Sequence, residues 1–397
     1  MKVLILGIGA QGSVIANEIS QNDKVSEVIC GDINLRLANE LVKSNAKITT
    51  KRVDAKNTQS IIEAARGVAI IVNALPPVFN IDVMNAALKV NAHYQDLASG
   101  PIEGLPFEQT VMRQLEQDKK WKEKSLTALI HTGTAPGIAN VLARRAADSL
   151  DVVKRIRLLF YGALETKRFI PFWWEPATAW GDMVKGAIVW RNGNYEEVPP
   201  VSGEEMYDFP RLGPQKVVWH EHEEPITLPI FIGKGLEYCD FKMGGSTIEL
   251  AIVFHKYGLL STNSIRVKGM DIKPFDVVLA LTPPAPQGEE VSEIIKEGIL
   301  REEGERIIEA EGEKDGRKTL IRYSFSSPGL EESFKRLRGS TSQSYITGLS
   351  AAAFTKLLIE DKVGLTGVFP PECLGTEAAD IVLQEIAKKG IIVAEVN

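Results

Sequence analysis

The first 140 residues alternate between short apolar runs and longer amphipathic stretches, and this alternation predicts their fold. The apolar runs have the length of buried strands, and the stretches between them carry apolar residues at helical spacing. The predicted strands are 2–6, 25–30, 48–53, 68–73, 93–97 and 127–131. The predicted helices are 13–20, 35–44, 58–65, 83–90 and 108–124. Strands separated by helices indicate βαβ units, and therefore an α/β fold with a doubly wound, Rossmann-type parallel sheet.

The pattern changes after about residue 150. Strand-like arms flank Asn192-Gly193 and again Asp315-Gly316, dipeptides that are typical of two-residue hairpin turns. The segment Thr247–His255 alternates and predicts a further strand, whereas 274–281 and 291–300 have helical spacing. This mixture predicts an inserted α+β domain built on an open mixed or antiparallel sheet. Helical spacing returns over 345–359 and 377–388, and 391–396 reads as a short last strand.

Composition narrows the class of protein. The 397 residues are 44% hydrophobic with a formal net charge of −6, which indicates a globular chain without the basic face that nucleic acids require. No apolar run approaches the ~18 residues of a membrane span, so neither nucleic acid nor membrane is an expected partner. The three cysteines, Cys30, Cys239 and Cys373, are far apart and form no CxxC. This usage is typical of a reducing compartment and predicts a cytoplasmic protein.

A glycine-rich turn follows the first predicted strand. Gly7-Ile8-Gly9-Ala10-Gln11-Gly12 matches GxGxxG, opens a predicted helix and precedes Asp32 by 20 residues. In this context Gly7 permits a tight turn, Gly9 lets backbone amides approach a pyrophosphate, and Gly12 allows close packing of helix on strand. Ala10 and Gln11 lie at the helix N-terminus, where a phosphate binds. The motif predicts dinucleotide binding.

Asp32 also bears on which dinucleotide binds. Its carboxylate can accept hydrogen bonds from the ribose hydroxyls and would repel a 2′-phosphate, so NAD is expected rather than NADP, although Arg36 lies close enough in sequence to offset this. Further cofactor contacts are expected where the parallel strands end. They are Ile33, Asp54, Ala55, Asn73, Ala74, Leu75, Leu97, Gly133, Ala135 and Pro136.

Oxidation of an amine by hydride loss requires a nitrogen lone pair, so an alkylammonium must first lose a proton. A carboxylate near the amine can orient the cation and accept that proton. Asp96, at a strand end on the ligand-binding edge, is the preferred candidate, and Glu175 is the alternative. Glu175 belongs to the aromatic stretch Phe172–Trp180, for which core packing is the expected role and an amine-binding wall the alternative.

A run of histidines and acids spans His220–Glu224. His220 and His222 would share one face of a strand, but the acids are poorly spaced to complete a metal site. We interpret the run as a solvated polar segment and expect no metal.

Several of these stretches together resemble the saccharopine dehydrogenase-like family. They are 3–12 with Asp32, 71–76, 93–97, 133–140 and 362–372. Three more, 191–199, 211–214 and 236–238, are similar to the lysine 6-dehydrogenase branch of that family. The resemblance implies oxidation of a C–N bond of an amino acid by a nicotinamide cofactor. It also implies that Arg211 holds a substrate carboxylate and that the chain forms a homodimer or tetramer.

The resemblance further implies that the C-terminal segment folds back onto the nucleotide domain. With the change in pattern, it gives residues 1–140 plus 340–397 as a discontinuous dinucleotide-binding domain. Residues 141–339 form the inserted domain for substrate binding and dimerisation.

The leading hypothesis is NAD-dependent oxidative deamination of L-lysine at its terminal amine. The first alternative is a saccharopine- or carboxynorspermidine-type reductase, whose more heavily carboxylated substrates call for more Arg and Lys in the pocket. A second alternative, of another class, is a non-catalytic NAD-binding sensor.

Overall fold

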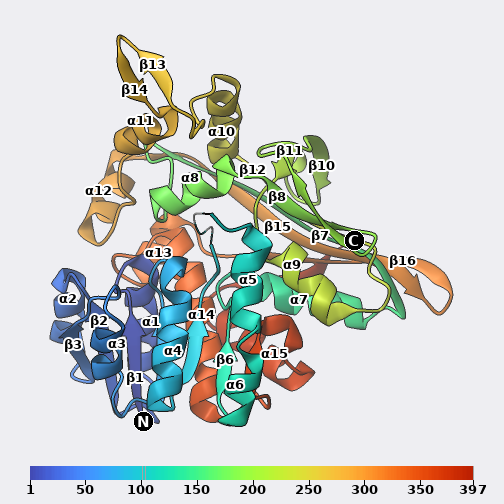
Figure 1. The fold of residues 1–397 in the computed structure, drawn as a ribbon. Coiled ribbons are helices and arrows are strands. Elements are labelled where there is room, and N and C mark those ends of the chain that lie inside the picture. The colour runs from blue at the N-terminus through green and yellow to red at the C-terminus, as the bar shows by residue number, and fades with distance from the viewer. Residues whose placement is uncertain (101, 103, 397) are drawn as a thin grey trace. The chain divides into compact units, whose positions relative to one another are not determined.

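The computed structural model describes residues 1–100, 102 and 104–396, which form two compact units (Figure 1). The first unit comprises residues 1–144 and 344–391, and the second comprises residues 145–343 and the chain from Ile392 onward. Among these residues, no helix combines the length and the apolar character that crossing a membrane requires.

The first unit contains a seven-stranded sheet in which every neighbouring pair is parallel. In sheet order its strands are β17 (Gly367–Phe369), β6 (Thr127–Leu129), β5 (His93–Asp96), β4 (Ile70–Asn73), β1 (Lys2–Leu6), β2 (Glu27–Asp32) and β3 (Ile48–Arg52). The helices of this unit are α1 (Ala10–Ser20), α2 (Arg36–Ser44), α3 (Thr58–Ala64), α4 (Asn80–Val90), α5 (Phe107–Leu115), α6 (Asp118–Glu123), α14 (Ser342–Glu360) and α15 (Thr376–Ala387). Helix α7 (Ile138–Asp148) crosses from the first unit to the second.

The parallel sheet confirms the predicted Rossmann-type fold, with two differences. The single helix expected over 108–124 is two helices, α5 and α6, because the chain makes a turn at Gln117, whose N–H donates to the Gln114 carbonyl. Behind this turn Trp121 is fully buried in the core of the unit. The strand β17 was not predicted, because its three residues lie between Gly364 and Pro370-Pro371, which are typical of a loop.

The second unit is built on a nine-stranded mixed sheet. Its main order is β10 (Glu205–Phe209), β11 (Gly213–Trp219), β12 (Tyr238–Gly244), β7 (Val152–Thr166), β15 (Ile299–Lys314), β16 (Arg317–Ser326) and β18 (Ile392–Val396). The hairpin β8 (Ala187–Arg191) and β9 (Asn194–Val198) joins it through β12. A separate small ribbon pairs β13 (Ile265–Val267) with β14 (Met270–Ile272). The helices are α8 (Pro176–Val184), α9 (Glu224–Ile232), α10 (Ser246–Lys256), α11 (Pro274–Leu281), α12 (Glu289–Glu297) and α13 (Leu330–Arg336).

Two sequence expectations for this part are wrong. The alternating segment 247–255 is helix α10, because only a helical stripe that includes Ile248 and Ala251 is buried, and closely spaced apolar residues fit both periods. The last strand, β18, pairs with β16 in the second sheet, whereas the sequence placed all of 340–397 with the nucleotide domain. Antiparallel pairing with β16 satisfies its backbone groups there. Residue 397 lies outside the described residues.

A buried ion network joins the C-terminal helices to the nucleotide half of the first unit. The Nζ of Lys356 on α14 lies 2.7 Å from Glu18 on α1 and 2.9 Å from Glu385 on α15, and Lys389 also contacts Glu18 at 2.7 Å. Burial alone would raise the pKa of Glu18, but the two lysines outweigh it and lower that pKa. The network therefore stabilises the assembly of α1, α14 and α15.

We predict that Lys356→Met lowers the free energy of unfolding at pH 7 by about 1–3 kcal/mol, because Glu18 loses a buried partner. Since the folded pKa of Glu18 lies below its unfolded value, this stabilisation is present above pH 4.5 and disappears as the pH falls through the folded pKa. Urea unfolding at pH 7 and in acid measures both effects. The control, Lys388→Met, removes an exposed partner of Glu385 and is expected to change stability by less than about 0.5 kcal/mol. Equal losses in the two variants would contradict this account.

Candidate active site

The turn between β1 and α1 leaves room for a phosphate. Gly7 has φ +86°, and a Cβ there would lie 2.6 Å from the Ala74 carbonyl oxygen. A Cβ on Gly12 would lie 1.9 Å from the Gly7 oxygen, whereas one on Gly9 would meet no atom within 4 Å. The first helical hydrogen bond runs from the Ser13 N–H to the Gly9 carbonyl, and the Gly7 and Ile8 amides donate to Gly31 and Asp32. The amides of residues 9–12 are therefore the ones that can face a ligand. The turn fits the pyrophosphate of a dinucleotide.

Asp32 closes this turn at the end of β2. Its Oδ2 accepts the Ile8 N–H at 2.7 Å, and its Oδ1 accepts the Asn34 N–H at 2.8 Å. The side chain is half-buried, and Ile33 beside it is 57% exposed. The structure thus brings Asp32 to the glycine turn, as the sequence predicted, while its contact with a ribose stays a prediction.

The other predicted cofactor residues follow the carboxyl ends of neighbouring strands. Asp54 and Ala55 follow β3, Ala74 and Leu75 follow β4, and Leu97 follows β5. Residues 133–136 form the loop between β6 and α7, and the Gly133 N–H donates to the Leu97 carbonyl. This edge of a parallel sheet is where nucleotides bind, and direct contact by each residue remains a prediction.

Asp96, the preferred proton acceptor, is 1% exposed. Its Oδ1 accepts the His131 N–H at 2.7 Å, and its Oδ2 accepts Gln114 at 2.6 Å and the Tyr94 hydroxyl at 3.0 Å. Burial raises the pKa of Asp96 to about 7, although these three donors oppose the shift. Asn73 extends the network by donating to Tyr94 at 3.2 Å. Because both oxygens of Asp96 are engaged, its geometry favours positioning of the loop that begins at His131.

The second unit contains a cluster of acids and histidines that we call the acidic cluster: Asp182, His220, Glu221, His222, Glu223 and Glu224. Strand β11 ends at Trp219, the His220 N–H donates to the Phe241 carbonyl at 3.2 Å, and α9 begins at Glu224. The His222 ring stacks on Phe241 with centroids 3.8 Å apart and an interplanar angle of 15°. The chain between strand and helix is therefore held against the sheet.

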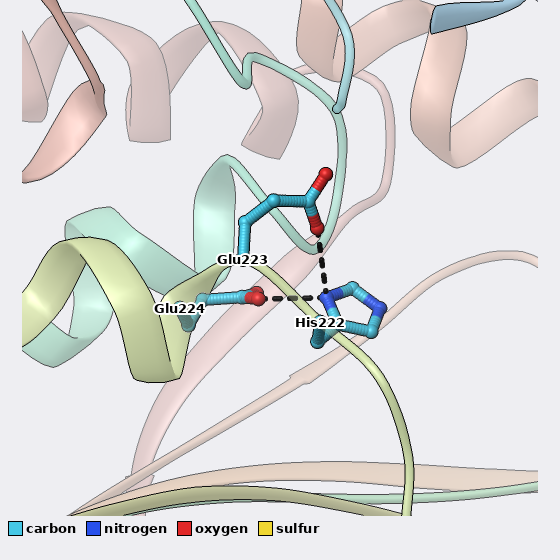
Figure 2. Close-up of side chains that lie close together, drawn as sticks. All are labelled: His222, Glu223 and Glu224. Carbon is cyan, nitrogen blue, oxygen red and sulfur yellow. Dashed lines mark hydrogen bonds and ion pairs between the residues drawn. The ribbon is translucent and has the colours of Figure 1, made fainter. Parts of the chain in front are cut away.

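The centre of the acidic cluster is an ion triad (Figure 2). Nδ1 of His222 lies 2.6 Å from Glu224 and 3.5 Å from Glu223, and both carboxylates are almost completely buried. Burial would lower the pKa of His222, but Glu224, Glu223 and Asp182 outweigh it and raise that pKa to about 9. His222 is therefore an imidazolium at neutral pH.

The other members of the acidic cluster have strongly shifted pKa values. Burial, reinforced by Asp182, raises the pKa of Glu221 to about 9. Burial raises the pKa of Asp182 to about 7, although His222 and Lys185 oppose it. Burial and the neighbouring His222 lower the pKa of His220 to about 4. The cluster thus gathers groups whose pKa values are strongly shifted by burial and by one another's charge, and such shifts are common at catalytic sites.

Three polar atoms of the acidic cluster are buried without a hydrogen-bond partner among the described residues. They are Glu221 Oε1, Glu224 Oε1 and His220 Nε2. Nδ1 of His220 lies 3.0 Å from the Glu221 carbonyl and carries the ring proton there, so Nε2 is an acceptor. The Glu224 oxygen and the ring nitrogen thus offer lone pairs to a donor-rich group, and Glu221 Oε1 does so once its carboxyl group has lost its proton.

His222, Glu223 and Glu224 could also hold a metal, since their ligand atoms lie within 4.8 Å of one another. The short contacts from His222 Nδ1 to both carboxylates, however, place a proton where the metal would be. The sequence interpretation of this run as solvated is wrong, because the run is enclosed between β11 and the apolar helix α9.

The remaining predicted catalytic residues make their hydrogen bonds outside the acidic cluster. Glu175 is exposed and caps α8 by accepting the Ala177 N–H at 3.2 Å. Arg211 is exposed, its guanidinium donates to the Gly304 carbonyl, and its N–H donates to Glu305. Of the aromatic stretch, Trp180 is buried in the core, stacks on Phe254 and donates to Thr282. The geometry assigns these residues capping, turn and packing contacts.

Sequence reasoning missed the catalytic potential of Glu221 and Glu224 and did not single out Asp182 at all. The available signal was position, since the polar run lies between the apolar strand end 217–219 and the apolar stretch 225–232. Residues between two buried elements tend to be buried with them.

Comparison with known proteins identifies the family. Residues 3–129 match the profile of the saccharopine dehydrogenase NADP-binding domain, and residues 133–391 match that of the saccharopine dehydrogenase C-terminal domain. The carboxynorspermidine synthase of Vibrio cholerae is 26% identical over 302 residues, which cover 71% of this chain and 73% of the relative. The carboxyaminopropylagmatine dehydrogenase of a Synechocystis species is 22% identical over 380 residues, covering 94% and 92%.

Two solved structures share the fold. Saccharopine dehydrogenase (L-Glu forming) from Saccharomyces cerevisiae has a TM-score of 0.69 at 14% identity and covers both chains completely. The homospermidine synthase of Legionella pneumophila, solved with NAD, has a TM-score of 0.71 at 14% identity and covers 100% of this chain and 91% of the other. The resemblance inferred from the sequence is confirmed: this chain belongs to the saccharopine dehydrogenase family and is an NAD(P)-dependent oxidoreductase of the amino-acid dehydrogenase type.

Proposed function

We propose that the chain catalyses NAD-dependent oxidoreduction at the C–N bond of a carboxylated di- or polyamine, forming or cleaving a secondary amine. The observation that carries this proposal is the acidic cluster, in which buried carboxyl groups surround one imidazolium. The four carboxyl groups of Asp182, Glu221, Glu223 and Glu224 outnumber the two cations that act on them, His222 and Lys185. An alkylammonium group is the complementary ligand, because it brings positive charge and several N–H donors.

The chemistry requires proton transfer at the substrate. When bound, the nicotinamide supplies or accepts a hydride. Condensation of an amine with a carbonyl releases water and needs a proton donor, and the reverse direction needs an acceptor. Glu221, with a pKa of about 9, carries a proton at neutral pH and can deliver it from Oε1, which has no hydrogen-bond partner among the described residues. His222 holds a second proton between Glu223 and Glu224.

The relatives support a carboxylated amine. Two of them are named for carboxynorspermidine and carboxyaminopropylagmatine. The second candidate function is oxidative deamination of lysine at its terminal amine, which the similarity of 191–199, 211–214 and 236–238 to that branch favours. Lysine would bring an amine to the same acidic cluster. We propose NAD rather than NADP because Asp32 lies at the glycine turn.

The dimer or tetramer expected from the resemblance, and a cytoplasmic location, remain predictions of the same proposal. Light scattering after gel filtration measures the first of these.

A substrate panel followed at 340 nm tests the proposed function. Carboxynorspermidine, saccharopine and lysine are each offered with NAD and with NADP. We expect turnover of carboxynorspermidine with NAD. Turnover of lysine alone would favour the second candidate, and no absorbance change with any compound would indicate the NAD-binding sensor.

We predict that Glu221→Gln weakens amine binding and stabilises the fold at the same time. Loss of a charge-assisted hydrogen bond should raise the KM of the amine about 10–100-fold. The folded pKa of Glu221 lies far above its unfolded value of 4.5, so the contribution of Glu221 to stability is most favourable below pH 4.5 and declines as the pH rises toward 9. Glutamine removes this decline and should add about 1–3 kcal/mol at pH 8.

Steady-state kinetics and urea unfolding at pH 8 and pH 4.5 measure these effects. The control is Glu237→Gln, which removes an exposed ion pair with Lys154. It should change neither the KM of the amine nor the free energy of unfolding. A Glu221→Gln variant that is less stable at pH 8 and keeps its amine KM would contradict the assignment.

We predict that Asp96→Asn lowers kcat/KM by at least ~100-fold and also weakens NADH binding. An amide keeps only one acceptor oxygen, so it cannot receive His131, Gln114 and Tyr94 as the carboxylate does. The loop that follows His131 would then shift. NADH fluorescence titration measures the affinity, and the exposed Asp82→Asn is the control. If Asp96→Asn lowered kcat/KM by this amount but left the NADH affinity unchanged, the positioning role would be contradicted and Asp96 would be assigned as the proton acceptor.

A further inference from the structure

Arg306 lies in the middle of the second sheet, on the same face as the acidic cluster. Strand pairing aligns Arg306 with Phe160 on β7, and Phe160 with Met243 on β12, so these side chains point to one face. Phe241, two residues before Met243, points to that face too and carries the stacked His222 ring. We call this face of the second sheet the His222 face.

The guanidinium of Arg306 has no hydrogen bond and no ion pair with any described residue. Its one recorded contact is with Phe325, whose ring centroid lies 5.5 Å from the guanidinium carbon. Burial lowers the pKa of Arg306 to about 10, which leaves the group charged at neutral pH. The side chain is half-buried and keeps some exposed surface. A half-buried cation without a counter-ion is less favourable than a paired one, so an anionic ligand that reached Arg306 would stabilise it.

On the opposite face of the same strands, in contrast to Arg306, the buried cations are paired with acids. There Arg157 forms ion pairs with Asp240 at 3.0 Å and Glu205 at 2.8 Å, and Lys242 contacts Glu205 at 2.6 Å. Arg211, the carboxylate-binding residue implied by the resemblance, is also associated with that face through Glu305. The fold therefore pairs its structural cations and leaves Arg306 on the His222 face unpaired.

Open space adjoins Arg306 on the His222 face. Gly304 precedes it by two residues on β15 and pairs with Gly162 on β7, so both positions face the same way. A Cβ built on Gly162 meets no atom within 4 Å. A Cβ on Gly304, by contrast, would lie 3.1 Å from the Tyr161 carbonyl oxygen. The absence of a side chain at Gly162 therefore leaves room for a small group beside Arg306, on the side away from Phe241.

Buried aromatic rings connect Arg306 to the acidic cluster. The ring centroids of Phe325 and Phe160 lie 5.7 Å apart, and those of Phe160 and Phe241 lie 4.9 Å apart. The His222 ring stacks on Phe241. Two strand spacings and two residues separate the Cα atoms of Arg306 and Phe241, which is roughly 12 Å. This distance joins backbone positions, and an extended aminoalkyl chain has a comparable length.

We propose that Arg306 binds the carboxylate of the substrate while the acidic cluster binds its amine, so that the His222 face selects molecules with these groups at opposite ends. This inference rests on the proposed function for the identity of the amine site. It assigns the substrate class as a carboxylated di- or polyamine and makes Arg306 the residue that separates it from a simple polyamine. A bidentate guanidinium–carboxylate pair supplies the discrimination.

Carboxynorspermidine and norspermidine test the proposal, because they differ only in the carboxylate. The ratio of their kcat/KM values is measured for wild type, Arg306→Met, Arg306→Lys and the exposed control Arg155→Met. We expect wild type to prefer the carboxylated compound by about 10–100-fold, and Arg306→Met to bring the ratio close to one. Arg306→Lys should restore only part of the preference, and Arg155→Met should keep all of it. Gly162→Val, which fills the space beside Arg306, should also reduce the ratio.

Calorimetric binding of both compounds, with NAD present, separates this proposal from the proposed function. A wild-type preference in binding that Arg306→Met abolishes supports the role of Arg306 even if neither compound turns over, in which case only the proposed reaction fails. Equal wild-type affinity for both compounds, failure of both to bind, or a preference that survives Arg306→Met would overturn the inference. Thermal unfolding of each variant checks that it folds, and NADH binding checks that the nucleotide site is intact.

Discussion

The removal of several carboxyl groups from water around a single imidazolium is the constraint on which the chemistry of the second unit depends. Glu223 and Glu224 are buried because strand β11 and helix α9 enclose them, and they are tolerated because His222 provides a counter-ion. At Glu221 burial and the neighbouring Asp182 outweigh the nearby cation of Lys185, so Glu221 keeps its proton. The arrangement costs folding free energy, and such cost is common where a protein prepares a site for a charged ligand.

The two faces of the second sheet divide structural from chemical roles. On one face, Arg157, Lys242, Asp240 and Glu205 satisfy one another in a dense ion network. On the other, the acidic cluster retains unpartnered oxygens among the described residues, and Arg306 retains an unpaired charge. Since period-2 alternation places neighbouring residues of one strand on opposite faces, the same strands serve both roles. In the first unit the carboxyl edge of the sheet and the glycine turn leave space in which a dinucleotide can bind.

The glycine turn, Asp32 and the parallel sheet were predictable because local geometry determines them. The spacing of the glycines specifies where the backbone must turn tightly or approach another segment closely. The acidic cluster was not predictable, because the polar sequence of residues 220–224 is compatible with both an exposed and a buried position. Helix α10 was mistaken for a strand because its apolar residues fit both periods. Arg306 could not be recognised either, because its lack of a carboxylate partner depends on which residues β7 and β16 place beside it. Burial and pairing are properties of the tertiary structure.

Proton release on amine binding tests the central claim most directly, and it requires no turnover. Norspermidine is titrated into the protein by calorimetry at pH 7.5 in buffers of different ionisation enthalpy. An ammonium group entering the acidic cluster should displace the proton that Glu221 holds through its pKa of about 9. The account predicts release of about one proton per amine bound in wild type, and a release in Glu221→Gln that is smaller by that proton. Binding without any proton exchange, or an equal release in both proteins, would contradict it.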